Sequence, residues 1–231
     1  SDKGIKGFVI SMKAFLGITI KGDLVAALAG EKLDHLINRA IEHNLTGLEE
    51  LGGIPGTVGG AIKGNVGAND KTISNYFFYA DYLSQDGKLH RKASNFDDFG
   101  YRSSPFKDTD IILTCALRLV PNKDSVQARQ KKEYYRTLKI KKGQFTAPSA
   151  GCFFKNPIGD KSAGELIDLA GLKGYSLNNA KVSPFHGNFI INPQKNATSQ
   201  ELYDLSQYVI QTVKEKFNIT LEYEIKLLGE F

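Results

Sequence analysis

The first candidate for ligand chemistry is the densest run of glycine in the chain. This run covers residues 47–70, GLEELGGIPGTVGGAIKGNVGAND, and contains eight glycines. Gly53, Gly56, Gly59 and Gly60 can adopt φ > 0 and let backbone N–H groups approach a ligand closely. Successive N–H groups in such a turn form a nest suited to a diphosphate. A tight structural turn is the alternative, since the spacing matches neither G-x-G-x-x-G nor the P-loop.

Three other residues have side chains suited to anion binding or proton transfer. Arg102, in YRSSPFK, can hold a carboxylate or phosphate through two parallel hydrogen bonds, although a surface arginine is the alternative. Cys152, in APSAGCFFKNP, has a thiol that can donate a proton or attack as a nucleophile, and structural burial is the alternative. Glu224 lies in a strand-like segment near the end of the chain, where an outward-facing carboxylate is the alternative.

The histidines give no support to a thiol-protease site. His186 is the only histidine after Cys152, and no clear Cys–His–Asn set is visible. We favour packing as the role of His186, and contact with substrate is the alternative. We also expect Cys115, in the apolar run IILTCALRLV, to be a buried core residue.

Hydrophobic periodicity predicts the elements that must position these residues in the first part of the chain. The apolar stripe between residues 31 and 44 predicts a helix, and Asp86-Gly87 predicts the turn of a hairpin. The other expected elements are strands at 7–11, 16–21, 24–29 and 111–120, a short helix in 94–102, and a basic helix after residue 121.

The last third of the chain alternates helix and strand. A helix is expected over 163–171, closed by Gly171, and strands over 187–192 and 219–229. Thr198 and Glu201 form a capping box that starts another helix. We predict an α+β protein with domains at 1–142 and 143–231.

Composition argues against a membrane-spanning protein and against a secreted, disulfide-rich protein. The chain has 231 residues, 41% of them hydrophobic, and no apolar run of the roughly 18 residues that a membrane span needs. No signal peptide is visible, and the two cysteines cannot build a disulfide framework, so we expect a reducing cytoplasm and no membrane partner.

The net charge is +5, and basic residues gather in 129–142. Such a cluster can be a solvated helix face, a nucleic-acid surface, or part of a site for an anionic small molecule. The glycine-rich segment favours the small anion.

Four segments in order resemble one enzyme family, the UDP-N-acetylenolpyruvylglucosamine reductases. They are GGIPGTVGGAIKGNVGA, YRSSPFK, PSAGCFFKNP, and the run from AGELIDLAGLKGYSLNNAKVSPFHGNFIIN through ATSQEL to LEYEIKLLGE. The resemblance implies a vanillyl-alcohol-oxidase (PCMH)-type FAD-binding domain followed by an α/β substrate-binding domain. It also implies reduction of UDP-N-acetylglucosamine enolpyruvate to UDP-N-acetylmuramate, a peptidoglycan precursor, with NADPH as the hydride source.

The resemblance also assigns roles to individual residues. Arg102 and Glu224 would lie at the substrate carboxyl and enolate, and Cys152 would take the place of the family's proton-donating serine. The remaining expected contacts are to flavin by Gly53, Ile54, Pro55, Gly56, Thr57, Gly59, Gly60, Asn65 and Gly67, and to substrate by Tyr101, Lys155 and Asn156. We expect a monomer with no metal site and no nucleic-acid partner.

The chemistry of this reaction needs those residue types. Hydride delivered to the terminal enol carbon builds negative charge on the carboxylate, and a fixed guanidinium stabilises that charge. The adjacent carbon then needs a proton from one positioned acid. A glutamate can polarise the carboxyl only if it is protonated, which requires a raised pKa.

The sequence departs from the family pattern in two places. Cysteine replaces serine at position 152, and a thiol is a competent donor near neutral pH. The chain opens on SDKGIKGFVI, which resembles the end of the family's Gly-rich G-G-G-S-N-L-L-V-S-D segment, so we expect part of the FAD site to lie outside this sequence. Two alternatives therefore stay open: a flavin-free module that binds UDP-sugars or a partner, and an FAD oxidoreductase with another substrate.

Overall fold

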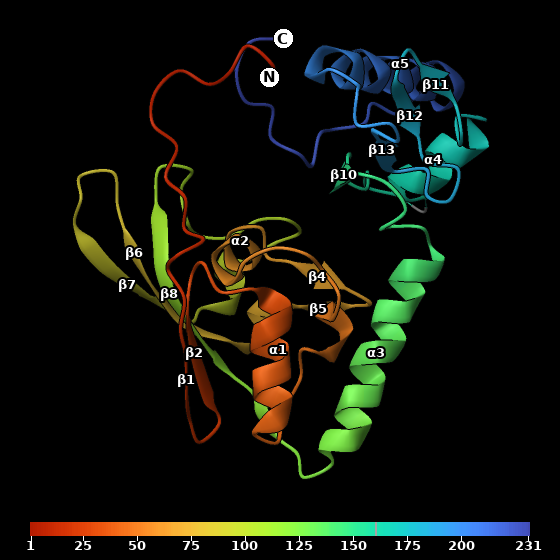
Figure 1. The fold of residues 1–231 in the computed structure, drawn as a ribbon. Coiled ribbons are helices and arrows are strands. Elements are labelled where there is room, and N and C mark those ends of the chain that lie inside the picture. Colours follow the sequence, from red (N-terminus) through yellow and green to blue (C-terminus); the bar gives the residue numbers. More distant parts are fainter. Residues whose placement is uncertain (160) are drawn as a thin grey trace. The chain divides into compact units, whose positions relative to one another are not determined.

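The computed structural model describes residues 1–159 and 161–231, and it divides into two compact units. One unit is residues 10–137, and the other combines residues 1–9 with 138–231. Figure 1 shows the elements of both units along the chain. Helix α3 (Ser125–Lys141) crosses the boundary between them. The predicted boundary after residue 142 stays a prediction.

The unit of residues 10–137 is built on a five-stranded antiparallel sheet. Its strand order is β1-β2-β8-β6-β7. The strands are β1 (Ile18–Lys21), β2 (Leu24–Leu28), β6 (Phe77–Leu83), β7 (Leu89–Ala93) and β8 (Ile111–Arg118). Strands β6 and β7 form the hairpin predicted around Asp86-Gly87. Cys115 lies in the middle of β8 with no exposed surface, which confirms the expectation of a core residue.

Two helices pack on this sheet. Helix α1 (Leu33–Glu42) buries the predicted apolar stripe, with Leu36, Ile37 and Ala40 in one core together with residues of β2 and β8. Helix α2 (Val58–Lys63) packs on β2, on β8 and against α1. The remaining elements are short: β3 (Leu45–Thr46), η1 (Glu49–Leu51), β4 (Gly67–Ala68), β5 (Lys71–Thr72), η2 (Ile73–Tyr76), η3 (Phe96–Asp98) and β9 (Val120–Pro121).

The other unit has its own sheet and core. Its strand order is β10-β13-β12-β11, and the strands are β10 (Ser149–Cys152), β11 (Ser176–Leu177), β12 (Ala180–Val182) and β13 (Phe189–Ile191). Helices α4 (Ala163–Leu169) and α5 (Ser199–Phe217) pack on one another and bury Leu166, Ile167, Leu205 and Val209. Both helices begin with a capping box, and that of α5 is the predicted pair Thr198 and Glu201.

The strand predicted at 7–11 is wrong. Within the described residues, no strand is assigned there, and Phe8 and Val9 expose 103% and 75% of their surface. A β-branched, apolar run becomes a strand only where a second strand meets its backbone N–H and C=O groups. In the described part of the chain, no sheet includes residues 7–11.

The strand predicted at 219–229 is also wrong. Within the part of the chain that the structure describes, strand pairing there is one isolated bridge, between Phe154 and Tyr223. Hydrogen bonds from Lys155 N to Glu222 O and from Glu224 N to Phe153 O flank this bridge. Alternation of apolar and polar residues continues past that bridge, but Leu227 and Leu228 are exposed. Half-burial in a sheet needs a partner along the whole strand, and among the described residues this segment pairs only around Tyr223, near its middle.

Within the described residues, no helix combines the length and the apolar character that crossing a membrane requires.

Candidate functional site

Residues 52–57 of the glycine-rich segment form a loop that runs directly into α2. Thr57 caps this helix, because its side-chain oxygen accepts a hydrogen bond from Gly60 N at 3.3 Å. Val58 N donates to Glu31 O at 2.8 Å, and Gly59 N donates to Ala29 O at 2.9 Å. The backbone at the start of α2 is therefore fixed to the segment that follows β2, and these three N–H groups have partners within the protein.

The outer edge of this loop is the part that a ligand can reach. Pro55, Gly56 and Gly60 are exposed, Ile54 and Thr57 are half-buried, and Gly59 is buried. Gly56 has φ 137°, a conformation that side chains rarely adopt, and a Cβ there would meet no atom within 4 Å. Gly59 instead allows close packing, since its Cβ would lie 2.8 Å from Ala29 Cβ. Flavin contact at this glycine-lined edge stays a prediction, and the N–H groups of Val58, Gly59 and Gly60 are already bonded within the protein.

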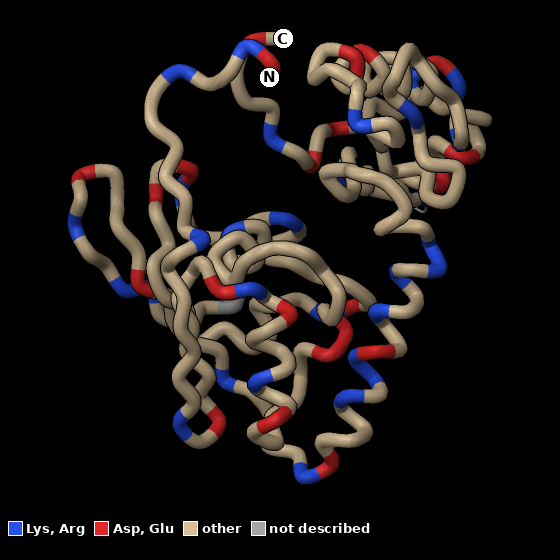
Figure 2. The backbone as a smooth tube through the Cα atoms, viewed as in Figure 1, with Lys and Arg blue, Asp and Glu red and all other residues tan. Residues whose placement is uncertain are grey.

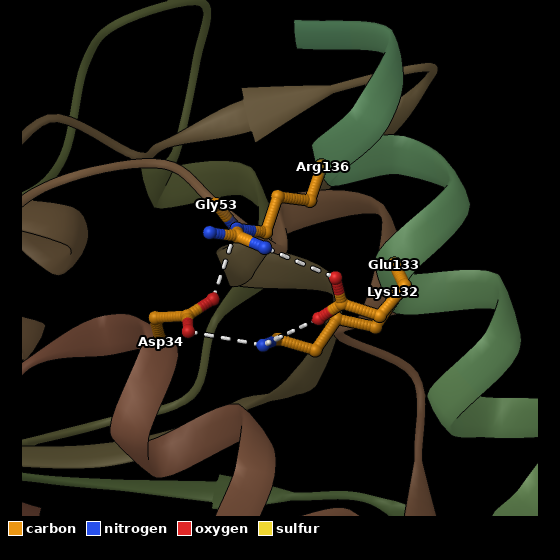
Figure 3. A network of polar contacts seen from close by, with 5 residues as sticks. All are labelled: Asp34, Gly53, Lys132, Glu133 and Arg136. Carbon is orange, nitrogen blue, oxygen red and sulfur yellow. Dashed lines mark hydrogen bonds and ion pairs between the residues drawn. The ribbon is translucent and has the colours of Figure 1, made fainter. Parts of the chain in front are cut away.

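A polar network holds Gly53, at the front of this loop (Figure 3). Gly53 N donates to Asp34 Oδ1 at 2.9 Å, and Lys132 Nζ donates to Asp34 Oδ2 at 3.0 Å. Glu133 lies 3.7 Å from Lys132 Nζ and accepts from Arg136 Nη1 at 3.2 Å. The stem of Arg136 covers Gly53, whose Cβ would come 2.9 Å from Arg136 Cγ. Helix α3 thereby joins α1 to the glycine-rich loop.

The charges in this network are stabilised mutually. Burial raises the pKa of Asp34, but the hydrogen bond from Gly53 N and the ion pair with Lys132 outweigh that effect and leave the pKa below its usual value. The Lys132 side chain is only 4% exposed. Nearby, Lys131 Nζ lies 2.7 Å from Glu50, whose side chain is 7% exposed. Figure 2 shows the basic and acidic residues along α3. Lys131 and Lys132 of this helix form ion pairs within the protein.

The loop that carries Arg102 is attached to the end of α2. Asn65 Nδ2 donates to Gly100 O at 2.9 Å, and Ser74 N donates to Asn65 Oδ1 at 3.3 Å. Arg102 has φ 53°, and its guanidinium carbon lies 5.3 Å from the ring centroid of the exposed Tyr101. Gly67 pairs with Thr72 in the small β4–β5 ladder that follows Asn65.

In the other unit, Cys152 and Glu224 lie on neighbouring segments. Cys152 ends β10 opposite Phe189 and is partly exposed. Phe153, the next residue, accepts a hydrogen bond from Glu224 N at 3.0 Å. Lys155 N donates to Glu222 O at 2.8 Å, and Lys155 Nζ lies 3.6 Å from the Glu222 carboxylate. The structure thus brings together the backbones that carry Cys152, Lys155 and Glu224.

The Asn156 side chain binds the backbone at the start of α4. Its Oδ1 accepts a hydrogen bond from Ala163 N at 3.1 Å. Each predicted site residue is thus placed within its own unit: the expected flavin ligands with Tyr101 and Arg102 in one, and Cys152, Lys155, Asn156 and Glu224 in the other. Their contacts with cofactor or substrate stay predictions.

Three residues that organise these segments escaped the sequence analysis. Asp34 and Lys132 are 98 positions apart, so no local pattern links them. Asn188 is buried and clamps Phe154, accepting from its N–H at 2.9 Å and donating to its carbonyl oxygen at 2.7 Å. A polar residue among the apolar neighbours of GNFIIN was the one available signal for Asn188.

His186 supports the same turn by packing. Its ring lies 4.5 Å from that of Phe189, and its Nδ1 accepts a hydrogen bond from Asn188 N at 3.2 Å. Burial, followed by the charges of Lys142 and Lys173, lowers the pKa of His186 below its usual value.

Comparison with known proteins gives the same family along the whole chain. Residues 143–228 match the family described as UDP-N-acetylenolpyruvoylglucosamine reductase, C-terminal domain, and residues 1–92 match an FAD binding domain. A UDP-N-acetylenolpyruvoylglucosamine reductase of Caldanaerobacter subterraneus subsp. tengcongensis is 36% identical over 230 residues, which are 100% of this chain and 76% of the relative. One of Streptococcus pneumoniae is 37% identical, over 99% of this chain and 75% of its own.

A solved structure agrees with these sequences. The crystal structure of UDP-N-acetylenolpyruvylglucosamine reductase (MurB) from Thermus caldophilus matches with a TM-score of 0.73 and 33% identity, covering 87% of this chain and 71% of that one. The predicted fold class, an FAD-binding domain followed by a substrate-binding domain, is confirmed. This chain belongs to the UDP-N-acetylenolpyruvoylglucosamine reductase family.

Proposed function

We propose that this chain catalyses the NADPH-dependent, FAD-mediated reduction of UDP-N-acetylglucosamine enolpyruvate to UDP-N-acetylmuramate. The observation that carries the proposal is the match to reductases of this name over the full length of the chain, at 36% and 37% identity. The two family matches support it further, because one is an FAD binding domain and the other is the reductase C-terminal domain.

We assign to the cofactor the open edge formed by Pro55 and Gly56 in the loop and by Gly60 in the first turn of α2. FAD, when bound, supplies hydride transfer between NADPH and the substrate. Thr57 and the network around Gly53 hold the loop in shape, so that its backbone need not reorganise when a diphosphate arrives. Ile54, Gly59, Asn65 and Gly67 complete the expected segment.

Arg102 is the group that we assign to the substrate carboxylate. Its guanidinium stabilises the negative charge that grows on that carboxylate as hydride adds to the enol carbon. Cys152 gives its thiol proton to the adjacent carbon, and Glu224 polarises the carboxyl group. Lys155 and Asn156 are assigned to the diphosphate of the UDP moiety, and Tyr101 to the substrate.

We further propose that the enzyme works as a monomer in the cytoplasm without nucleic acid. A reducing compartment is supported because two cysteines, one of them buried in the core of residues 10–137, cannot build a disulfide framework. Size-exclusion chromatography with light scattering tests the monomer, and a gel shift at several salt concentrations tests nucleic-acid binding.

The experiment that tests the function measures flavin and turnover together. The chain is purified, its flavin absorbance is recorded before and after FAD is added, and NADPH oxidation is followed with and without the enolpyruvyl substrate. Arg102→Lys is expected to lower kcat by about 100-fold, because it removes the planar donor pair. Arg118→Lys, on the outer end of β8, is the matched control and is expected to leave kcat unchanged.

Each outcome decides between the reductase and its alternatives. Substrate-dependent NADPH oxidation with a product two hydrogens heavier supports the reductase. Flavin binding with turnover on other substrates only would make the chain a different FAD oxidoreductase. A protein that takes up no flavin yet binds UDP-sugars would instead be a binding module.

A further inference from the structure

The backbone around Arg102 is held in a conformation that arginine seldom adopts. Arg102 has φ 53°, in the left-handed region, where the Cβ of a residue crowds the neighbouring backbone. Gly100 N donates to Ser103 O at 3.2 Å, and Ser103 N donates back to Gly100 O at 3.1 Å. The two central residues of this closed turn are Tyr101 and Arg102. A turn with a strained residue persists only where its surroundings determine it.

One buried side chain supplies that support at the start of the turn. Asn65 is 4% exposed, and its carboxamide is bonded at both ends. Its Nδ2 donates to Gly100 O at 2.9 Å, and its Oδ1 accepts from Ser74 N at 3.3 Å. Gly100 O therefore receives two donors, one from Ser103 and one from Asn65, which fixes the direction of the peptide from which Tyr101 and Arg102 continue.

The end of the loop is attached to the same part of α2. Ser104 Oγ donates to Lys63 O at 2.8 Å. Lys63 Nζ donates to Phe106 O and forms an ion pair with Asp108 at 3.0 Å. Lys63 and Asn65, only two positions apart, thus hold both ends of the loop that carries Arg102. Residues 59 and 60, which lie in the segment expected to meet flavin, are on the same short helix.

We propose that Asn65 is a positioning residue for Arg102, acting through Gly100 and not through contact with flavin. The inference rests on the proposed function, in which Arg102 binds the substrate carboxylate. It reassigns the side chain of Asn65, which the family resemblance placed among the flavin ligands. The Asn65 carboxamide is bonded to the backbone at Gly100 and at Ser74. It therefore sets the direction of the Arg102 guanidinium relative to α2.

Asn65→Gly is the direct test, and Asn44→Gly is its matched control. Asn65 has φ 41° and Asn44 has φ 57°, so glycine fits the backbone at both positions and removes only the side chain. Asn44 is exposed and lies in the same unit. Asn65→Asp adds a second arm, because it keeps an acceptor for Ser74 N but replaces the donor to Gly100 O with a carboxylate oxygen.

We expect kcat to fall between about 10-fold and 100-fold in Asn65→Gly and in Asn65→Asp, since small misplacements of a reacting group cost that much. The rate at which NADPH bleaches the bound flavin and the FAD dissociation constant should match those of Asn44→Gly. The rate at which the enolpyruvyl substrate reoxidises the flavin, seen as restored absorbance, should fall by the same factor as kcat. A role in fold stability alone would not slow reoxidation by the substrate while leaving reduction by NADPH unchanged.

A second readout needs no activity. Trypsin cleaves after Arg102, and mass spectrometry of the flavin-free protein should show faster cleavage there in Asn65→Gly than in Asn44→Gly. An inactive parent would refute the proposed function, while the cleavage rates would still test the attachment of the turn. Variants at position 65 that match the control in both readouts would overturn the inference. Loss of FAD affinity with unchanged kcat at saturating FAD would also overturn it.

Discussion

Asp34 and Lys132 form an ion pair of 3.0 Å between residues 98 positions apart, and Asp34 uses its other carboxylate oxygen to hold Gly53. One carboxylate therefore connects α1, α3 and the front of the glycine-rich loop. The Lys132 side chain is almost completely buried, so loss of the Asp34 charge would leave it with the more distant carboxylate of Glu133, at 3.7 Å.

Asp34→Asn is expected to destabilise the unit of residues 10–137. The amide still offers an oxygen to Gly53 N but loses the charge that pairs with Lys132. The expected cost is about 1–2 kcal/mol of unfolding free energy, after allowance for solvent at the 40% exposed Asp34 side chain. Urea unfolding measures it. Glu42→Gln, on the same helix and paired with Arg39 at the surface, should cost less than about 0.5 kcal/mol, and equal costs would contradict the role of the network.

The same pair predicts a dependence on acid. The pKa of Asp34 is lowered in the folded state, so the unfolded chain takes up this proton first as pH falls. The stabilisation is therefore present above the ordinary carboxyl pKa of about 3.9 and is lost as pH falls through the lower folded value. Asp34→Asn should flatten the acid limb of the stability curve, and urea unfolding at a series of pH values measures that limb.

The two thiols should differ sharply in reactivity. Burial raises the pKa of Cys115 to about 12, whereas Cys152 is partly exposed at the end of β10. A thiol reagent at pH 7.5 should therefore label one cysteine in the native protein and two in denaturant, because only the thiolate reacts. Peptide mapping identifies the site, and native labelling of Cys115 would contradict the prediction. Labelling of Cys152 should abolish turnover if this thiol is the proton donor.

His186 should make the other unit less stable in mild acid. Its pKa is lowered in the folded state, so the unfolded chain binds the proton first. The stabilisation is complete above the unfolded pKa of about 6.5 and declines as pH falls through the folded pKa. His186→Asn keeps an acceptor for Asn188 N without a titrating group, and it should reduce the pH slope of the melting temperature between pH 7 and pH 5. Melting curves of the parent and of His186→Asn across this range check the prediction, and equal slopes would contradict it.

Gly56→Ala should weaken FAD binding at the open edge of the loop. A Cβ at position 56 meets no protein atom within 4 Å, so the new methyl group points into space that we assign to the cofactor, and φ 137° adds strain. We expect at least about a 10-fold rise in the FAD dissociation constant from lost close approach. Gly87→Ala, also at positive φ with open space, is the control in the β6–β7 hairpin. Equal FAD affinities in the two variants would remove Gly56 from the site.

Local patterns in the sequence were sufficient for elements whose stability is local. The apolar stripe of α1, the hairpin turn at Asp86-Gly87 and the capping box of α5 depend on residues within a few positions of one another. The family motifs identified the reductase fold, and the comparisons confirmed it.

Tertiary structure alone decided the features that depend on distant partners. Residues 7–11 and 219–229 have strand-like patterns, but a strand forms only where another backbone completes its hydrogen bonds, and most of these residues have none in a sheet of the described chain. The bond from Asn65 to Gly100 likewise joins residues 35 positions apart. Periodicity describes which face of an element is buried, but it does not determine which polar group from a distant segment will contact that element.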